Sequence, residues 1–187
     1  MNQINQQNYL NTYYCILDTM MNRMLRAPLS NSISYNFIVM MIPHHQGAIE
    51  MCANVLKYTK NETLQEIAFQ IIRQQTQSIK NMQKIIEDCK CCTNMDNEIC
   101  QYNQKIDQIM CNMFTEMKNA RITQNINANF IYEMIPHHQG AIYMSKETLS
   151  HTICPQLKPI LENIITLQEQ GIKQMTMLLQ EIENCQF

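Results

Sequence analysis

Two adjacent histidines follow a proline at two places in this chain, each time within the nine-residue stretch Met-Ile-Pro-His-His-Gln-Gly-Ala-Ile. The copies occupy residues 41–49 and 134–142. Imidazole nitrogens bind transition metals, and soft thioether ligands such as methionine select Cu(I). Because methionine and histidine occur together in both copies, the stretch indicates a metal site. Its histidines are His44, His45, His137 and His138.

The similarity between the two parts of the chain extends well beyond this stretch. Sliding the sequence against itself by 93 residues pairs residues 15–92 with residues 108–185 at 30 identical positions of 78. We therefore interpret the protein as a tandem duplication. Of nine cysteines only Cys92 has a counterpart, Cys185, whereas methionines are widely retained. The retained pairs are Met20 and Met113, Met24 and Met117, Met41 and Met134, Met51 and Met144, and Met82 and Met175.

Methionine at helical spacing is more often a core residue than a ligand. A core methionine, however, exchanges with Leu or Ile at little cost. All five pairs nevertheless remain Met, while the neighbouring apolar pair Ile85 and Leu178 differs. We therefore interpret at least part of the set as metal ligands. The alternative is a metal-free helical scaffold or partner-binding module with a methionine-rich interface.

The composition predicts an all-α protein, because helix formers dominate and the alternation typical of strands is absent. We expect six helices, three in each half, the first at roughly residues 4–26. The second should begin near Ser30–Ser32 and the third near Asn61. The first repeat, residues 1–92, and the second, residues 93–187, should pack as one compact unit, because the linker between them is short.

The repeated stretch should lie in the middle of a helix. Pro43 is expected to kink this helix, unless it starts a new one. Glycine lowers the stability of a helix interior, yet both halves have a glycine at the position of Gly47. This suggests close approach of another backbone. Gln75 and its counterpart Gln168 lie on apolar stripes, so they should be buried and could accept a hydrogen bond from an imidazole.

Adjacent helical residues lie about 100° apart, so the two histidines of a copy cannot point the same way. On this spacing His44 shares a flank with Met51, and the two form the natural ligand pair. His45 falls beside Cys52 and is either a second ligand or an interface histidine. The second copy repeats the arrangement, with His137 near Met144 and His138 beside Ser145.

Several other functions find no support. The chain has no Glu-x-x-His pair for a diiron site, no glycine-rich phosphate loop and no nucleophile elbow, so we expect no enzyme. A net charge of −2 provides no positive field for nucleic acid. Cys89-x-x-Cys92 has zinc-like spacing but no second pair, so these thiols are either incidental or ligands of Cu(I) or Zn(II).

The N-terminus lacks the basic and apolar regions of a signal peptide, and no segment reaches the length of a membrane span. We therefore expect a cytoplasmic protein that does not bind membranes, or an extracytoplasmic one if a signal was removed. The expected partner is a metal ion. A copper-transfer protein or self-association is a further expectation.

The sequence resembles family DUF305, whose members include copper-binding proteins of the CopM type. Two motifs carry the resemblance: Phe37-x-x-x-Met-Ile-Pro-His-His-Gln-Gly-Ala-Ile-x-Met51 and Gln75-x-x-x-Ile79-x-x-Met82. The resemblance implies a ferritin-like antiparallel helical bundle that binds Cu(I), and by analogy Ag(I), for storage, buffering or resistance. The residues that it implies as ligands are His44, His45, Met51, His137, His138 and Met144.

Overall fold

The computed structural model describes residues 3–184, which form six α-helices and no strand. This confirms the all-α prediction. Cys185, the counterpart of Cys92, lies outside the described residues. The helices are α1 (Gln3–Leu25), α2 (Ile33–Val55), α3 (Glu62–Lys90), α4 (Asp96–Lys118), α5 (Ile126–Leu149) and α6 (Lys158–Asn184).

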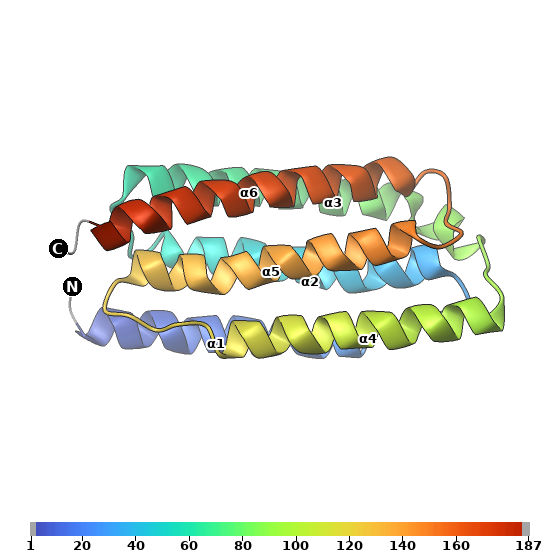
Figure 1. Ribbon diagram of the computed structural model, residues 1–187, viewed down its shortest axis with the longest axis horizontal. Helices are drawn as coiled ribbons and strands as arrows, with labels where there is room; N and C mark the ends of the chain where they lie inside the picture. The colour runs from blue at the N-terminus through green and yellow to red at the C-terminus, as the bar shows by residue number, and fades with distance from the viewer. Residues whose placement is uncertain (1–2, 185–187) are drawn as a thin grey trace.

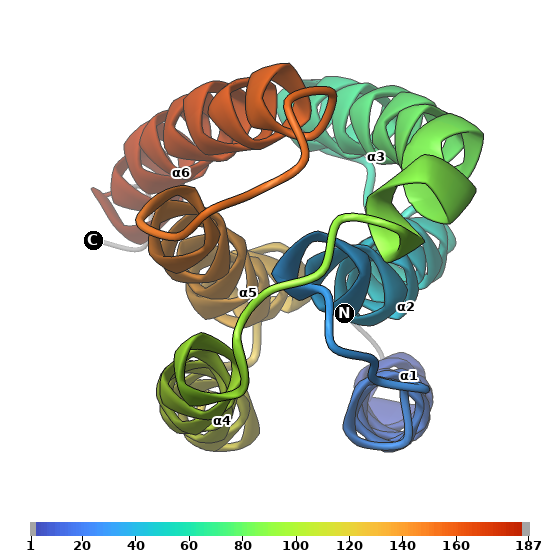
Figure 2. The same cartoon turned by 90° about the vertical axis from the view of Figure 1, so that its right-hand side faces the viewer.

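The helices lie in three layers, each an antiparallel pair: α1 with α4, α2 with α5, and α3 with α6 (Figure 1). The middle helix α2 packs against both α3 and α5, and α6 packs against both α3 and α5. These four helices therefore close a four-helix bundle, as the end-on view shows (Figure 2). Outside this bundle, α1 packs against α2 and α4 packs against α5.

Side-chain caps fix where the helices begin. The Ser32 hydroxyl accepts a hydrogen bond from the Tyr35 amide (3.2 Å), and the Asn61 side chain accepts one from the Leu64 amide (2.8 Å). Each cap satisfies one of the amides that the first turn of a helix leaves without a partner. The predicted starts of the second and third helices are therefore confirmed.

Pro43 and Pro136 lie inside the uninterrupted helices α2 and α5, so the alternative that Pro43 starts a new helix is wrong. The expectation for Gly47 also needs correction. The group closest to Gly47 is not another backbone but the Met20 side chain, whose sulfur would lie 2.6 Å from an added Cβ. Met113 lies over Gly140 in the same way. Each glycine thus makes room for a buried thioether.

Polar contacts of α1 link the two halves of the chain. The buried Tyr9 hydroxyl donates to the Glu133 carboxyl group on α5, and the Tyr13 hydroxyl donates to the Met117 carbonyl on α4 (2.8 Å). The linker between the halves is short, as predicted, because α3 extends to Lys90 and α4 begins at Asp96. Among the described helices, none is long and apolar enough to cross a membrane.

Candidate metal centre

The four predicted histidines are buried where α2 and α5 pack together in the middle layer. The rings of His44 and His137 stack, with centroids 3.7 Å apart and an interplanar angle of 28°. His45 lies 5.9 Å from His44, and His138 lies 6.0 Å from His137. The imidazoles of the two halves therefore form one continuous row, with His44 and His137 as its inner pair and His45 and His138 as its outer pair.

Hydrogen bonds define the state of part of this row. His137 Nε2 lies 3.1 Å from the His44 carbonyl oxygen, which can only accept, so Nε2 carries the proton of a neutral His137. The lone pair of His137 is then on Nδ1. His45 Nε2 lies 3.0 Å from the Ser78 hydroxyl on α3.

Five of the six remaining ring nitrogens are unusual because they are buried without a hydrogen bond of normal geometry. They are both nitrogens of His44 and the Nδ1 atoms of His45, His137 and His138. Leaving a buried polar group unpaired costs about 1–3 kcal/mol. A row of such atoms is an expensive feature in a folded core, and it is the arrangement expected where nitrogen lone pairs serve a ligand.

Burial keeps these imidazoles neutral. Loss of solvation lowers the pKa of all four, and for His44, His45 and His138 neighbouring histidines lower it further. The pKa of His45 falls to about 3 and that of His137 to about 4. Because a histidine must be unprotonated to bind a metal, the row is in its ligand form at neutral pH.

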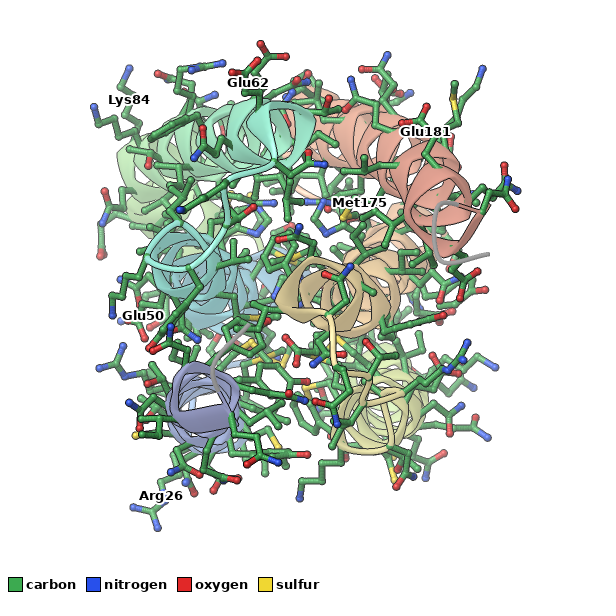
Figure 3. The ribbon with its side chains drawn as sticks, turned by 90° about the vertical axis from the view of Figure 1, so that its left-hand side faces the viewer. Arg26, Glu50, Glu62, Lys84, Met175 and Glu181 are labelled. Atoms are coloured by element: carbon green, nitrogen blue, oxygen red, sulfur yellow. The ribbon has the colours of Figure 1, made fainter. Side chains whose placement is uncertain are left out.

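All ten predicted methionines are buried, with at most 2 % of each exposed. They lie on both sides of the histidine row. Met20 and Met113 contact α2 and α5 from the layer of α1 and α4, where Figure 3 shows sulfur atoms gathered. Met175 extends from α6 into the interior on the opposite side (Figure 3). Met82, Met24 and Met117 belong to the outer layers, and the other four lie on the histidine helices: Met41, Met51, Met134 and Met144.

The glutamines behave differently from the expectation. Gln75 and Gln168 are buried as predicted, each only 3 % exposed. Their Oε1 atoms, however, accept no hydrogen bond from a histidine or from any other described group. The prediction that these glutamines accept from an imidazole is therefore wrong. Ser78 pairs with His45 instead, and in the second half the His138 ring lies against Gly171. Gln75 and Gln168 line a crevice of about 10 Å³ together with His45.

Sequence reasoning missed Ser78 and its counterpart Gly171, although the 93-residue offset pairs them. A Cβ added to Gly171 would lie 3.0 Å from both Cδ2 and Nε2 of His138. Ser78 thus bonds His45, while Gly171 lets the His138 ring approach the backbone of α6. The detectable signal was a polar residue three positions after the buried glutamine, present in only one half.

The donor atoms restrict what the centre could bind. No three His, Cys, Asp or Glu side chains within residues 3–184 are arranged to hold a metal ion. Beside the imidazoles, the buried methionine sulfurs are the further soft donor atoms present in this core. Neutral nitrogen and thioether donors suit Cu(I) and related soft ions, whereas Mg²⁺ and Ca²⁺ require oxygen ligands.

Residues 34–179 match the model of the family described as a domain of unknown function, DUF305. This match covers most of the chain, so the protein belongs to this family and the predicted resemblance is confirmed. No curated protein matches the sequence.

Solved structures of CopM are similar to this one. The Ag-bound form is 31% identical over 79% of this chain and 95% of CopM, with a TM-score of 0.59. The Cu(I)-bound form is 31% identical over 79% of this chain and 96% of CopM, with a TM-score of 0.57. A DUF305 fragment from Deinococcus radiodurans, 19% identical over 82% of this chain and 99% of the fragment, shares the fold with a TM-score of 0.60.

Proposed function

We propose that this protein binds Cu(I) in its core through histidine nitrogens and methionine thioethers, and that it stores or buffers the metal, or confers resistance to it, without catalysing a reaction. The observation that carries the proposal is the row of neutral, buried imidazoles with unpartnered nitrogens, above all His44 and His137. A core that only had to pack would replace these nitrogens with carbon at a gain in stability.

The inner pair argues for one centre common to both halves. His44 belongs to α2 and His137 to α5, yet their rings are in contact. A ligand that uses the lone pair of His137 therefore lies beside a histidine of the first half. Met51 and Met144 follow these histidines by seven residues on the same helices, which keeps them as our nearest thioether candidates.

The similar CopM structures support the choice of metal. They include a silver-bound form, a Cu(I)-bound form and a Cu(II)-bound form that is 32% identical over 79% of this chain. Silver and Cu(I) are both soft monovalent ions, so one set of thioether and imidazole donors can take either. We extend this preference to the present chain because its core contains buried imidazoles and thioethers.

The test is an anaerobic Cu(I) titration against a competing chelator. All nine cysteines are replaced, by Ala at the buried positions and by Ser elsewhere, so that thiolates cannot bind the metal. Circular dichroism establishes that the variant keeps its helices. We expect this protein to retain Cu(I). A folded variant that gives up all copper to the chelator would disprove the histidine and methionine centre.

A second measurement does not depend on replacing cysteines. X-ray absorption of the copper-loaded wild-type protein reports the atoms around the metal, and the proposed centre requires nitrogen as well as sulfur neighbours. His151→Ala provides the matched control for the titration, because this histidine lies outside the row, between Glu98 and Glu147. Its loss should leave copper binding unchanged.

A further inference from the structure

Cysteines from both halves of the chain meet at one end of the bundle. Cys89 ends the buried face of α3, Cys92 follows in the linker, and Cys154 lies in the loop between α5 and α6. This end faces the viewer in Figure 2, where the end of α3 and the α5–α6 loop can be followed. The three residues are the thiol cluster.

The backbone of the thiol cluster is held by the start of α2. The Ser32 hydroxyl donates to the Cys89 carbonyl oxygen (2.6 Å), and the Cys154 amide donates to the Ser34 hydroxyl (2.8 Å). Ser32 and Ser34 lie two residues apart at the start of α2, so they hold the two cysteine backbones at the same end of this helix. Two residues 65 positions apart in sequence are thereby fixed by a common support.

The side chains of the thiol cluster interact directly. The Cys154 thiol donates to Gln156 Oε1 (2.7 Å) and the Cys92 thiol donates to the Asp88 carbonyl oxygen (3.6 Å), so within the cluster the Cys154 sulfur can accept a hydrogen bond from Cys89. Burial and these neighbours raise the pKa of Cys89, and the nearby Cys154 side chain raises that of Cys92. Cys89 is 0% and Cys154 2% exposed, whereas Cys92 is partly open to solvent.

The opposite end of the molecule shows that the fold does not need these thiols. At the 93-residue offset, Ile182 corresponds to Cys89 and Asn61 corresponds to Cys154. Asn61 there serves as the cap of α3. The pair of Cys89 and Cys154 therefore occurs at one end only, which is evidence against a purely structural role common to both halves.

The geometry points to a second soft-metal site, in which Cys154 and Cys89 hold one Cu(I) ion as thiolates and Cys92 is the thiol through which the ion enters. Two thiols bind Cu⁺ and release two protons, giving a bis-thiolate complex without any change of oxidation state. Soft thiolates select Cu(I). Two such ligands suffice for Cu(I), whereas structural zinc requires four, and the described chain offers no such group.

This site shares with the proposed function only the identity of the metal, because it uses neither a histidine nor a methionine. The two can therefore fail separately. Cu(I) bound by thiolates absorbs in the ultraviolet through sulfur-to-metal charge transfer, and a thioether and imidazole centre lacks this thiolate band. The band is the readout that belongs to the thiol cluster alone.

The experiment compares full-length proteins during anaerobic Cu(I) titration with a competing chelator. We expect Cys154→Ser to lose one Cu(I) per chain together with the thiolate band. The control combines Cys100→Ser with Cys111→Ser, two exposed cysteines on α4, and should keep both. The band should also persist in protein carrying His44→Ala and His137→Ala, which separates this site from the core.

Cys154→Ser keeps the main-chain amide that donates to Ser34, so this variant should fold, and Cys89→Ala provides a second variant with the same expected loss. An unchanged band in either folded variant would overturn the inference. Equal losses in the control would overturn it as well. Retention of Zn(II) by wild-type protein, lost in Cys154→Ser, would show that the thiols form a zinc site instead.

Discussion

The inner and outer histidine pairs have the same sequence context but different surroundings. His44 and His137 contact each other across the two halves, whereas His45 and His138 each face the outer helix of their own half. The inner histidines thus contact each other, while the surroundings of the outer histidines differ between the halves, because Ser78 stands where the second half has Gly171. Two histidines adjacent in sequence therefore make different contacts.

The difference shows how one motif can place one histidine at the contact between the two halves and the next histidine against the outer helix of its own half. A 100° step along the helix turns one imidazole to the opposite half and the next to the neighbouring helix. The inner pair has three unpartnered nitrogens, whereas the outer pair has two. If the row binds copper, the inner pair should contribute most.

Removing the inner pair should have the largest effect on copper binding. His44→Ala with His137→Ala is expected to weaken Cu(I) affinity by at least about 100-fold, the upper range for loss of groups that only support a metal site. His45→Ala with His138→Ala should cost about tenfold. Competition titration measures both double variants. Equal or reversed effects would contradict the assignment of the inner pair as the principal ligands.

The next prediction concerns the stability of the fold at low pH, which should depend on the two pairs to a similar extent. The folded state lowers the pKa of all four imidazoles, so below about pH 6.5 the unfolded chain binds protons that the folded chain does not. The free energy of unfolding should then fall by about 1.4 kcal/mol per pH unit for each histidine. For His137 this loss should end near pH 4, where the folded imidazole titrates.

Urea unfolding of the metal-free protein between pH 7 and 4.5 measures this slope. His44→Leu with His137→Leu and His45→Leu with His138→Leu should each reduce the slope by a similar amount, since both pairs are buried. Bound copper should resist acid to below pH 5, because protons compete only near the lowered pKa values. A copper affinity that already falls at pH 6.5 would contradict the neutral, buried state of the row.

A smaller effect is expected from the methionines of the outer layer. Met82→Leu with Met175→Leu nearly conserves volume, so the free energy of unfolding should change by less than about 1.5 kcal/mol. Cu(I) affinity should nevertheless fall about tenfold, if these thioethers support the row from its α3 and α6 side. Met95→Leu with Met177→Leu, both exposed, is the matched control. Unchanged affinity would make Met82 and Met175 core residues.

The smallest change makes the two halves alike. Ser78→Ala removes the hydroxyl that bonds His45 and should lower the free energy of unfolding by about 1 kcal/mol. It should alter the nitrogen chemical shifts of His45 but not those of His138, which already lacks this partner. Nuclear magnetic resonance of ¹⁵N-labelled histidine resolves the two rings. A shift of equal size at both would show that the outer pair is not independent.

Local features of the fold were predictable because they depend on neighbouring residues. The caps at Ser32 and Asn61, the burial of Gln75 and Gln168, and the helical position of the histidines all follow from short-range pattern. The 100° spacing also correctly predicted that His44 and His45 point in different directions. That argument uses the positions of residues on a single helix and needs no contact with another helix.

Contacts between helices of different halves were not predictable in the same way. The stacking of His44 on His137 depends on where α2 crosses α5, which is set by the packing of all six helices. Gln75 was assigned to an imidazole because periodicity places it on the inner face, but its register relative to His45 favours Ser78. The meeting of Cys154 with Cys89 has no short-range signal at all.

The bonds of α1 to the second half also set an order of events during synthesis. The hydrogen-bond partner of the Tyr9 hydroxyl lies 124 residues later in the chain, and that of the Tyr13 hydroxyl lies 104 residues later. At about 5–20 residues per second, the ribosome needs on the order of ten seconds to deliver Glu133 after Tyr9. Through that interval α1 can already pack on α2, but the two tyrosine hydroxyls lack the partners they have in the complete fold. The burial of these hydroxyls is therefore completed only after the second half has emerged.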